Sequence, residues 1–374
     1  MDFKVLCKSP ASRARVGKIR TPHGEFETPV FMPVGTQGSV KALTPDDLEE
    51  IGVRIILANV YHLFLRPGYR LIGKMGGLHA FMNWKGPILT DSGGFQVYSL
   101  SGLRSISDEG VTFRSHLDGS RAFLGPREAM TIQKVLGADV SMCLDECAPY
   151  PAGHDYVANS VRLTTLWAAA CMEHREENQA LFGIVQGGTY LDLRERSARD
   201  LVAMGFDGYA LGGLSVGEGR ETRNRVIRGT VEFLPSDKPA YLMGVGKPED
   251  ILDAVSWGVD MFDCVMPTRN ARNGTLFTGT GRLVIKNARY ADDERPIEED
   301  CGCYTCTHFS RAYLRHLFMA RELLVYRLNS IHNLYYYSRL MADIRKALRD
   351  GSFEDFRRAY DEQMRDMPGD SATE

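Results

Sequence analysis

The chain has 374 residues, 44% of them hydrophobic and 25% charged, with a formal net charge of −3. This length suits one large α/β domain with a small appendage, and the small net charge gives no overall sign of a nucleic-acid partner. The N-terminus lacks the apolar run of a signal peptide, and no stretch reaches the roughly 20 apolar residues of a membrane helix. Five of the eight cysteines show no disulfide spacing. We therefore expect a cytoplasmic protein with no membrane partner.

The first segment, residues 1–28, predicts an antiparallel β-hairpin with its turn near Pro22-His23-Gly24. After it, one unit repeats along the chain: a short apolar strand ends in a polar or glycine-rich turn, and a segment with helical periodicity follows. Eight strands are expected, at 29–35, 54–59, 87–93, 139–146, 181–188, 208–213, 240–246 and 261–268.

Eight strands that alternate with helices predict a closed parallel (β/α)8 barrel over residues 29–274. An open doubly wound sheet is the competing fold. Such a sheet usually has fewer strands and often carries a phosphate-binding fingerprint after the first one, which this chain lacks.

Helix signals fall between the strands. Thr44 and Pro45 are a cap and a first helical residue for the segment 44–52. Similar helical segments are 125–137, 154–178, 190–205 and 247–258, and four of the five segments end at a glycine.

Residues 275–366 form the predicted appendage. A second hairpin is expected around Gly279-Thr280-Gly281, followed by a metal-binding segment and C-terminal helices. The last residues, 367–374, read as a frayed tail.

Three closely spaced cysteines, Cys301, Cys303 and Cys306, lie in this appendage within a polar stretch that offers no apolar pattern to bury them. Thiolates at this spacing can converge on one tetrahedral ion, which predicts a structural zinc site with a fourth ligand. His308 and His332 both remain candidates for that ligand. His332 is favoured, because a helical run can present it whereas His308 lies only two residues beyond the last cysteine.

Polar residues gather where the predicted strands end, and in such barrels this end carries the working residues. The candidates are Asn59, Asp91, Asp145, Gln186, Gly212, Gly213, Gly244, Gly246 and Asp263. Asp91 and Asp145 also suit helix caps. Asp263 reads as a mid-strand residue among apolar neighbours, where a carboxylate is costly to bury, so it is the best nucleophile candidate.

Two carboxylates that flank an anomeric carbon can form and resolve a glycosyl-enzyme intermediate. A third carboxylate, with Gln186 and the backbone of Gly213, suits the hydrogen-bonding edge of a purine-like base. Between residues 264 and 291 there are five basic residues and no acidic one: Arg269, Arg272, Arg282, Lys286 and Arg289. Such a stripe can hold a phosphate backbone, although a solvated hairpin face is the ordinary alternative.

Several motifs together resemble the tRNA-guanine transglycosylase family over nearly the whole chain. They are DSGGFQV (91–97), FGIVQGG (182–188), YALGGLSVGE (209–218), YLMGVG (241–246), FDCVMPTRNARNG (262–274) and CGCYTC with a later histidine. The resemblance implies a barrel with a zinc-bearing subdomain. It also implies exchange of the wobble guanine in tRNAs with GUN anticodons, those for aspartate, asparagine, histidine and tyrosine, for a 7-deazaguanine.

The resemblance assigns roles to individual residues. It makes Asp263 the nucleophile that forms a covalent ribosyl intermediate, and Asp91 the general acid/base. The expected substrate-binding residues are Asp145, Gln186, Gly212, Gly213, Leu214, Glu218, Met243, Gly244, Phe95, Cys147 and Val216. The expected RNA-binding residues are Lys247, Arg269, Arg272 and Asn273. The zinc ligands become Cys301, Cys303, Cys306 and His332.

Cys147 and Val216 look like the pocket of the bacterial form, which takes 7-aminomethyl-7-deazaguanine, releases guanine and works as a homodimer. The eukaryotic form takes the bulkier queuine beside a non-catalytic partner. Phe309, Tyr313 and His316 lie at helical spacing and suit either an aromatic dimer patch or core packing. The alternatives are a nucleosidase-like barrel with a structural zinc and a non-catalytic tRNA-binding subunit. His62, near another strand end, reads as a packed core residue.

Overall fold

The computed structural model describes residues 1–100, 104–176 and 179–365. The last two residues of the helical segment expected at 154–178, and the tail expected at 367–374, lie outside the described residues. No helix in the described ranges is long and apolar enough to cross a membrane.

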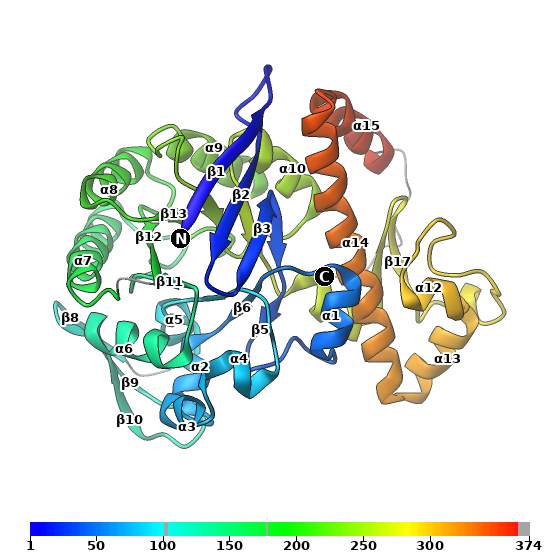
Figure 1. The fold of residues 1–374 in the computed structure, drawn as a ribbon, viewed down its shortest axis with the longest axis horizontal. Coiled ribbons are helices and arrows are strands. Elements are labelled where there is room, and N and C mark those ends of the chain that lie inside the picture. The colour runs from blue at the N-terminus through cyan, green and yellow to red at the C-terminus, as the bar shows by residue number, and fades with distance from the viewer. Residues whose placement is uncertain (101–103, 177–178, 366–374) are drawn as a thin grey trace.

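One parallel sheet forms the centre of the molecule, with helices around it (Figure 1). Its strand order is β4-β15-β14-β13-β12-β11-β7-β6-β5. The two strands at its ends, β4 (Val30–Met32) and β5 (Val34–Gly35), are halves of one strand that is divided at Pro33, a residue with no N–H to donate. β4 pairs with β15 and β5 pairs with β6, and Leu57 N donates to Pro33 O at 2.9 Å. The sheet therefore closes on itself, which confirms the predicted barrel.

The other strands fall at the seven remaining predicted positions. They are β6 (Ile56–Ala58), β7 (Ile88–Thr90), β11 (Val140–Met142), β12 (Ala180–Val185), β13 (Gly208–Leu211), β14 (Ala240–Leu242) and β15 (Met261–Asp263). Each is shorter than expected, so the polar residues of the motifs stand at or beyond the strand ends. Asp263 is the last residue of β15, and its prediction as a mid-strand residue was wrong.

Helices surround the barrel, and all five that the cap signals predicted are present. In order, the helices of this part are α1 (Pro45–Ile51), α2 (Val60–Leu65), α3 (Tyr69–Lys74), α4 (Gly77–Met82), α5 (Gly94–Leu100), α6 (Pro126–Leu136), α7 (His154–Glu173), α8 (Leu191–Met204), α9 (Arg220–Val231), α10 (Pro248–Ser256) and α11 (Met266–Arg272). At the start of α1, Thr44 Oγ1 accepts from Asp47 N, and the Asp47 carboxylate accepts from Thr44 N. This reciprocal pair satisfies two backbone donors that a helix start leaves free.

The N-terminal segment has one strand more than predicted. β2 (Arg15–Thr21) and β3 (Gly24–Thr28) form the expected hairpin, with its turn at Pro22-His23, and β1 (Asp2–Lys8) adds a third antiparallel strand beside β2. A second three-stranded sheet was missed: β8 (Arg104–Ser107), β9 (Gly110–Arg114) and β10 (Arg121–Leu124), between α5 and α6. Its strands are only four or five residues long, and β8 and β10 are largely exposed or half-buried, so the three carry little apolar pattern.

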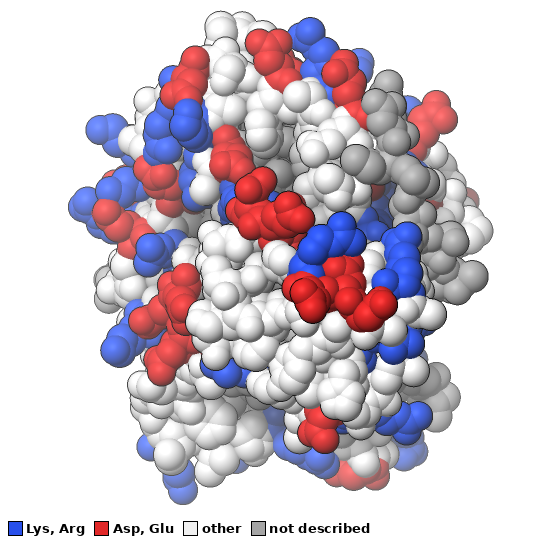
Figure 2. Space-filling model, turned by 90° about the vertical axis from the view of Figure 1, so that its right-hand side faces the viewer, with Lys and Arg blue, Asp and Glu red and all other residues white. Residues whose placement is uncertain are grey.

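The C-terminal segment begins with the predicted hairpin, β16 (Thr275–Thr278) and β17 (Gly281–Val284). It continues through the short 3-10 helix η1 (Ala288–Tyr290), α12 (Tyr304–His308), α13 (Arg311–Ala320), α14 (Leu323–Arg349) and α15 (Phe353–Arg365). The long helix α14 runs between the barrel and α12–α13 (Figure 1). The side that carries α12 and α13 faces the viewer in Figure 2, where charged groups of both signs surround a broad uncharged area.

A buried ion pair ties the N-terminal sheet to the barrel. Arg15 Nε and Nη2 donate to the two oxygens of Asp260 at 2.9 and 2.6 Å, and Asp260 Oδ2 also accepts from Ala240 N at 2.8 Å. Asp260 is fully buried, one residue before β15. The pair therefore connects β2 with the strand that ends in Asp263.

We expect Asp260→Asn to lower the free energy of unfolding by about 3–5 kcal/mol, because it leaves the Arg15 guanidinium buried without a counter-charge. Urea unfolding checks this value. Glu25→Gln, which breaks the exposed pair with Lys18, is the control and should leave the midpoint unchanged. Equal effects of the two substitutions would contradict the structural role given to the buried pair.

Candidate active site

A cavity of about 1250 Å³ opens at the carboxyl ends of the barrel strands. It is lined by sixteen of the seventeen residues that the sequence assigned to catalysis, substrate or RNA: Asp91, Phe95, Asp145, Cys147, Gly212, Gly213, Leu214, Val216, Glu218, Met243, Gly244, Lys247, Asp263, Arg269, Arg272 and Asn273. The seventeenth, Gln186, lies directly behind the wall and is 1% exposed. The fold therefore brings these residues to one site, although Asp91 and Asn273 are 182 residues apart in the sequence.

Asp263 is held through one of its two carboxylate oxygens. Oδ1 accepts from the Tyr241 hydroxyl at 2.6 Å and from Gly244 N at 2.8 Å. Oδ2 accepts no hydrogen bond from any part of the chain that the structure describes. Burial raises the pKa of Asp263, and the two hydrogen bonds oppose that rise. The carboxylate is thus oriented on one side and free on the other, the arrangement that a nucleophile needs.

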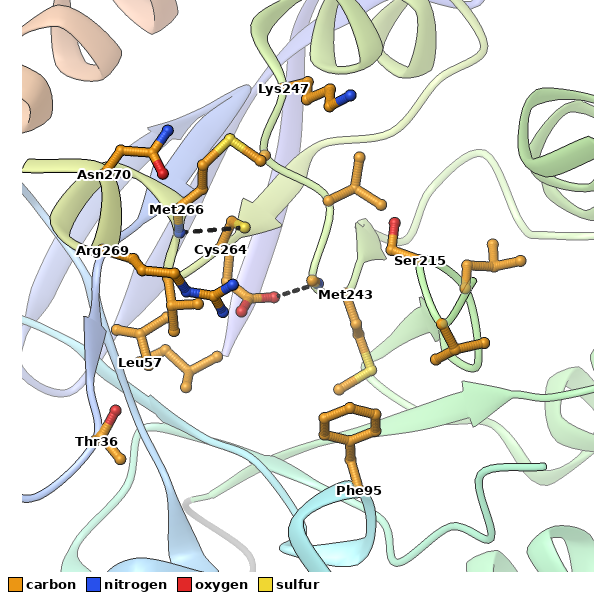
Figure 3. A pocket seen from close by; sticks show the side chains of 18 of the residues that line it. Thr36, Leu57, Phe95, Ser215, Met243, Lys247, Cys264, Met266, Arg269 and Asn270 are labelled. Atoms are coloured by element: carbon orange, nitrogen blue, oxygen red, sulfur yellow. Dashed lines mark hydrogen bonds between the residues drawn. The ribbon is translucent and has the colours of Figure 1, made fainter. Parts of the chain in front are cut away.

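Cys264, the next residue, is a second nucleophilic group at the same place. Its thiol accepts from Met266 N at 3.4 Å (Figure 3), and burial raises its pKa to about 11. At neutral pH it is a protonated thiol, which is a poor nucleophile. The raised pKa of Cys264 therefore favours Asp263 as the nucleophile of this pair.

Asp91 lies on the opposite wall, just beyond β7. Its Oδ1 accepts from Val60 N at 2.8 Å, and its Oδ2 accepts from the Asn59 side chain. It thus caps the start of α2, which follows the neighbouring strand β6, and not the start of the helix that follows it in sequence. Burial raises its pKa to about 6, with a further contribution from the Asp263 charge. A carboxyl group with this pKa can both accept and release a proton near neutral pH.

Asp145 belongs to a buried polar network in the wall. Ser92 Oγ donates to its Oδ1 at 2.9 Å, and Gln186 Nε2 donates to its Oδ2 at 2.8 Å. These are side-chain contacts, so the alternative of a helix cap does not apply. Burial raises the pKa of Asp145 to about 6.

The glycine pair 212–213 is required by the Gln186 side chain. A Cβ at Gly213 would lie 2.3 Å from Gln186 Oε1, and a Cβ at Gly212 would lie 2.7 Å from Gln186 Nε2 and 2.6 Å from Ile184 Cγ2. Gly213 also has φ +65°, which other residues adopt at a cost. The backbone therefore passes directly over the amide, and Gly212 and Gly213 line the cavity in front of it.

Arg194 supports the backbone around this network, and its role was not predicted from the sequence. Its guanidinium is fully buried and donates to three carbonyl oxygens, those of Gly188, Val185 and Gly212, at 2.8–2.9 Å. Burial lowers its pKa to about 10, so it remains charged. Arg194 lies on α8 among other charged residues, where an arginine is typical of a solvent-exposed helix face, and the sequence contains no signal that this one points inward.

A loop beyond β13 closes another side of the cavity. The Glu218 carboxylate accepts from Ser215 N at 2.5 Å and from Val216 N at 3.0 Å, and Ser215 takes the strained φ of +60°. Because the N–H and C=O of a trans peptide point in opposite directions, the Leu214 carbonyl is turned away from Glu218. Its oxygen is therefore left for another donor.

Two large side chains face each other across the cavity. Phe95 comes from α5 and Met243 follows β14, and in Figure 3 the thioether chain of Met243 points toward the phenyl ring. Phe95 is 45% exposed, unusual for an apolar ring. Such a pair can hold a flat aromatic ligand from both faces.

Basic side chains form the outer rim. Lys247, Arg269, Arg272, Arg282 and Lys286 all line the cavity. Lys247 and Arg269 form no ion pair with any described residue. Burial lowers the pKa of Arg272, and the Arg269 charge adds to that effect. Arg289, the fifth residue of the predicted stripe, is not part of the rim; it donates to the Tyr290 hydroxyl instead. His62, expected in the core, lines the cavity with its ring edge-on to Tyr61 and His116.

A buried cluster of Cys301, Cys303, Cys306 and His332 confirms the predicted metal-binding set. The sulfur atoms lie 3.8, 3.7 and 3.3 Å from His332 Nδ1. A sulfur and a nitrogen bound to one tetrahedral ion at about 2.3 and 2.0 Å would be about 3.5 Å apart. His332 Nε2 lies 2.7 Å from the Phe277 carbonyl, which fixes the ring so that Nδ1 faces the sulfurs. His308 is exposed and bonds to Tyr304 O.

The metal cluster is coupled to the cavity through α14. Next to His332, Asn333 donates to the carbonyls of Pro267 and Thr275 at 2.9 and 3.0 Å, and one turn earlier Asn329 donates to Ala271 O at 3.1 Å. These acceptors lie on α11, which carries Arg269 and Arg272, and at the start of β16. Fixing His332 therefore fixes the helix that presents Arg269.

The fold and the site define an α/β-barrel enzyme with three carboxylates, a basic rim and a cysteine-rich metal centre. The model of the family described as queuine tRNA-ribosyltransferase matches residues 9–366. Proteins named queuine tRNA-ribosyltransferase are similar over almost their whole length. The one from Syntrophobacter fumaroxidans is 56% identical over 361 residues (96% of this chain, 97% of the relative), and the one from Pelotomaculum thermopropionicum is 55% identical over 371 residues (99% and 100%). A Staphylococcus aureus relative is 56% identical over 359 residues (96% and 94%).

The chain therefore belongs to the queuine tRNA-ribosyltransferase family, also called the tRNA-guanine transglycosylases, which are pentosyltransferases.

Cys303→Ala should remove the bound metal and lower the thermal unfolding midpoint, because a structural site with three of its four ligands loses most of its affinity. Metal content and unfolding temperature are the two measurements. His308→Ala, which removes a nearby histidine outside the cluster, should leave both unchanged. A Cys303→Ala protein that kept its metal would contradict the ligand set.

Proposed function

We propose that the protein exchanges the wobble guanine of tRNAs with GUN anticodons for 7-aminomethyl-7-deazaguanine by double displacement through Asp263. The observation that carries this proposal is the half-bound carboxylate of Asp263, with one oxygen fixed and the other open to the cavity. The family of the chain supplies the reaction class.

In the first step, Asp263 Oδ2 attacks C1′ of the wobble nucleotide, and the bond from C1′ to N9 of guanine breaks. The electron pair of that bond leaves with guanine, which Asp91 protonates. In the second step, the Asp91 carboxylate takes the N9 proton of the incoming base. That base attacks C1′ and displaces Asp263, so Asp91 and Asp263 return to their starting forms and one base has replaced another.

The wall network suits the pyrimidine edge of both bases. The remaining lone pairs of Asp145 accept from the ring N–H and the exocyclic amine, while Gln186 and Gly213 N donate to the carbonyl oxygen. Gln186 Nε2 has two hydrogens, so it serves Asp145 and the base together. Phe95 and Met243 hold the two faces of the base.

The 7-substituent then points to the loop beyond β13. An aminomethyl group is an ammonium at neutral pH and donates to the Leu214 carbonyl, which Glu218 keeps turned away from itself. Cys147 and Val216 complete this side of the pocket and leave a space for a small substituent, which favours the aminomethyl base over queuine.

The basic rim holds the tRNA. Lys247, Arg269 and Arg272, with Asn273, stand at the outer edge of the cavity, where the phosphates on either side of the wobble nucleotide would lie. In the metal centre we place one structural zinc ion, because three thiolates and one imidazole with no open position are typical of zinc. The zinc has no part in the chemistry.

We also propose a homodimer in the cytoplasm. The Phe309 and Tyr313 rings stack at 5.3 Å on the C-terminal side, Tyr313 is 39% exposed and His316 is exposed beside it. Exposed Met319 and Leu323 continue the apolar surface, and such surfaces are typical of protein interfaces. A cytoplasmic location fits the eight free cysteines.

Asp263→Ala should abolish the covalent protein–RNA adduct and base exchange while tRNA binding persists. The adduct is detected on a denaturing gel after the protein is mixed with labelled tRNA without an incoming base. Cys264→Ala is the matched control, since it removes the adjacent nucleophilic group, and it should still form the adduct. An adduct with Asp263→Ala, or its loss with Cys264→Ala, would contradict the assignment.

The exchange rate should fall as the pH is lowered through about 6, by roughly tenfold per pH unit, because Asp145 must be ionised to accept hydrogen bonds from the base. Burial raises the pKa of Asp145 to about 6, so it gains a proton in that range. Asp91, whose pKa burial also raises to about 6, gives up its proton in the first step and is not impaired on this limb. The pH profile of kcat/KM measures this limb. A flat profile down to pH 5 would contradict the role of Asp145.

A loss of activity at low pH can be told apart from acid unfolding, because these carboxyl groups make the folded state more stable at low pH, not less. A carboxyl group whose pKa is higher in the folded chain contributes stability that is fully present below its unfolded pKa, near 4, and is lost as the pH rises through about 6. Asp91 and Asp145 therefore favour the folded state at the acid end. Thermal unfolding measured over the same range provides the control.

A further inference from the structure

At the other end of the barrel, three side chains from distant segments meet. His23 lies in the turn between β2 and β3, His79 lies on α4, and Asp139 directly precedes β11. Asp139 Oδ2 accepts from Ile88 N, the first residue of β7, at 2.9 Å. The cluster therefore stands at the amino-terminal ends of the strands, at the opposite end of the barrel from the cavity. Nothing in the proposed reaction uses it.

We propose that His23, His79 and Asp139 form a second metal site, which takes a divalent transition cation such as Zn²⁺ or Ni²⁺. One ligand atom from each residue lies within 4.8 Å of the other two. His23 Nδ1 is 2.9 Å from Asp139 Oδ1, and His79 Nε2 is 3.4 Å from Asp139 Oδ2. Nitrogen and oxygen ligands of one tetrahedral ion with bonds of about 2.0–2.1 Å are about 3.3 Å apart.

The donor types select the class of cation. Two imidazole nitrogens and one carboxylate suit Zn²⁺, Ni²⁺ or Cu²⁺, whereas Ca²⁺ and Mg²⁺ prefer sites made of oxygen. The two imidazole rings stack, with centroids 3.6 Å apart and planes 16° from parallel. An imidazole lone pair lies in the plane of its ring, so the more exposed ring, that of His23, has to turn before both nitrogens face one ion.

The carboxylate is already held in place without an ion. Besides Ile88 N, the backbone N of His23 donates to Asp139 Oδ1 at 3.2 Å. These backbone donors orient Asp139 in the way that outer contacts orient a metal ligand. His79 Nε2 also lies 3.1 Å from the Gly86 carbonyl, so without metal this nitrogen carries the proton, and an ion has to displace it.

The exposed fraction of the side chain increases from Asp139 through His79 to His23. The side chain of Asp139 is fully buried, that of His79 is 14% exposed and that of His23 is 43% exposed. An ion can thus enter from the His23 side, and water can complete its coordination. Bound there, it would link the N-terminal sheet, α4 and β11, which lie far apart in sequence, and it would stabilise the fold without touching the chemistry.

The test uses the full chain with zinc already bound at the cysteine cluster. Ni²⁺ is titrated into this protein by calorimetry, with total metal per chain measured after removal of excess ion. We expect one further ion per chain, and a higher thermal unfolding midpoint when it binds. His23→Gln and His79→Gln should each abolish both effects. His154→Gln, which removes a surface histidine paired with a single aspartate, Asp192, should change neither.

X-ray absorption at the nickel edge keeps the proposal testable if the variants do not fold. The unmodified protein should show only nitrogen and oxygen neighbours around nickel. Sulfur neighbours would assign the ion to the cysteine cluster and overturn the proposal. No additional ion, or an additional ion that persists in both histidine variants, would overturn it as well. Such results would leave His23, His79 and Asp139 as a hydrogen-bonded clamp without metal.

Discussion

Burial of three carboxylates at one end of a closed barrel is the constraint on which the rest of the site depends. Asp91, Asp145 and Asp263 would each be costly to place there without donors. Each is therefore met by side-chain or backbone donors from a neighbouring strand end: Asn59 and Val60, Ser92 and Gln186, and Tyr241 and Gly244. Closure of the sheet at Pro33 brings these strand ends together.

The donors divide the three carboxylates by role. Asp91 and Asp145 have both oxygens engaged, whereas Asp263 has one oxygen engaged and one open. In the proposed reaction the open oxygen forms the bond to ribose. The pKa of about 6 for Asp91 suits a group that passes a proton between two bases. A single buried wall with placed donors would thus provide both the proposed nucleophile and the proposed proton carrier.

The C-terminal segment contributes to the site indirectly. The metal cluster fixes His332, and the asparagines beside it on α14 bond to the backbone of α11 and β16. Tyr337, further along α14, donates to the Gly246 carbonyl in the loop beyond β14. The segment that holds the cysteine–histidine cluster, remote from the carboxylates, therefore sets the position of the basic rim, which in the proposed function holds the anticodon loop.

The barrel and the cysteine–histidine cluster could be predicted from the sequence, because the signals for them were local. The strand–turn units, the cap at Thr44 and the cysteine spacing each lie within about ten residues, and the barrel and metal cluster followed from them. The motifs of the family resemblance supplied the residues around the cavity. The small sheet of β8–β10 was missed because its short strands bury few side chains.

Contacts between distant segments were harder to predict. The inward direction of Arg194 is set by the carbonyls of strand ends that its own helix does not contain. The meeting of His23, His79 and Asp139 depends on how the N-terminal sheet docks onto the barrel. No local pattern reports either arrangement, since both arise from tertiary packing.

A base-exchange assay tests the central claim most directly. The purified protein is mixed with a GUN-anticodon tRNA that carries labelled guanine at the wobble position, and 7-aminomethyl-7-deazaguanine and queuine are supplied in parallel. The account predicts release of label with the aminomethyl base and none with queuine. Release with queuine would contradict the pocket assigned to Cys147 and Val216. No release with either base, while tRNA still binds, would contradict the transglycosylase function and the role of Asp263.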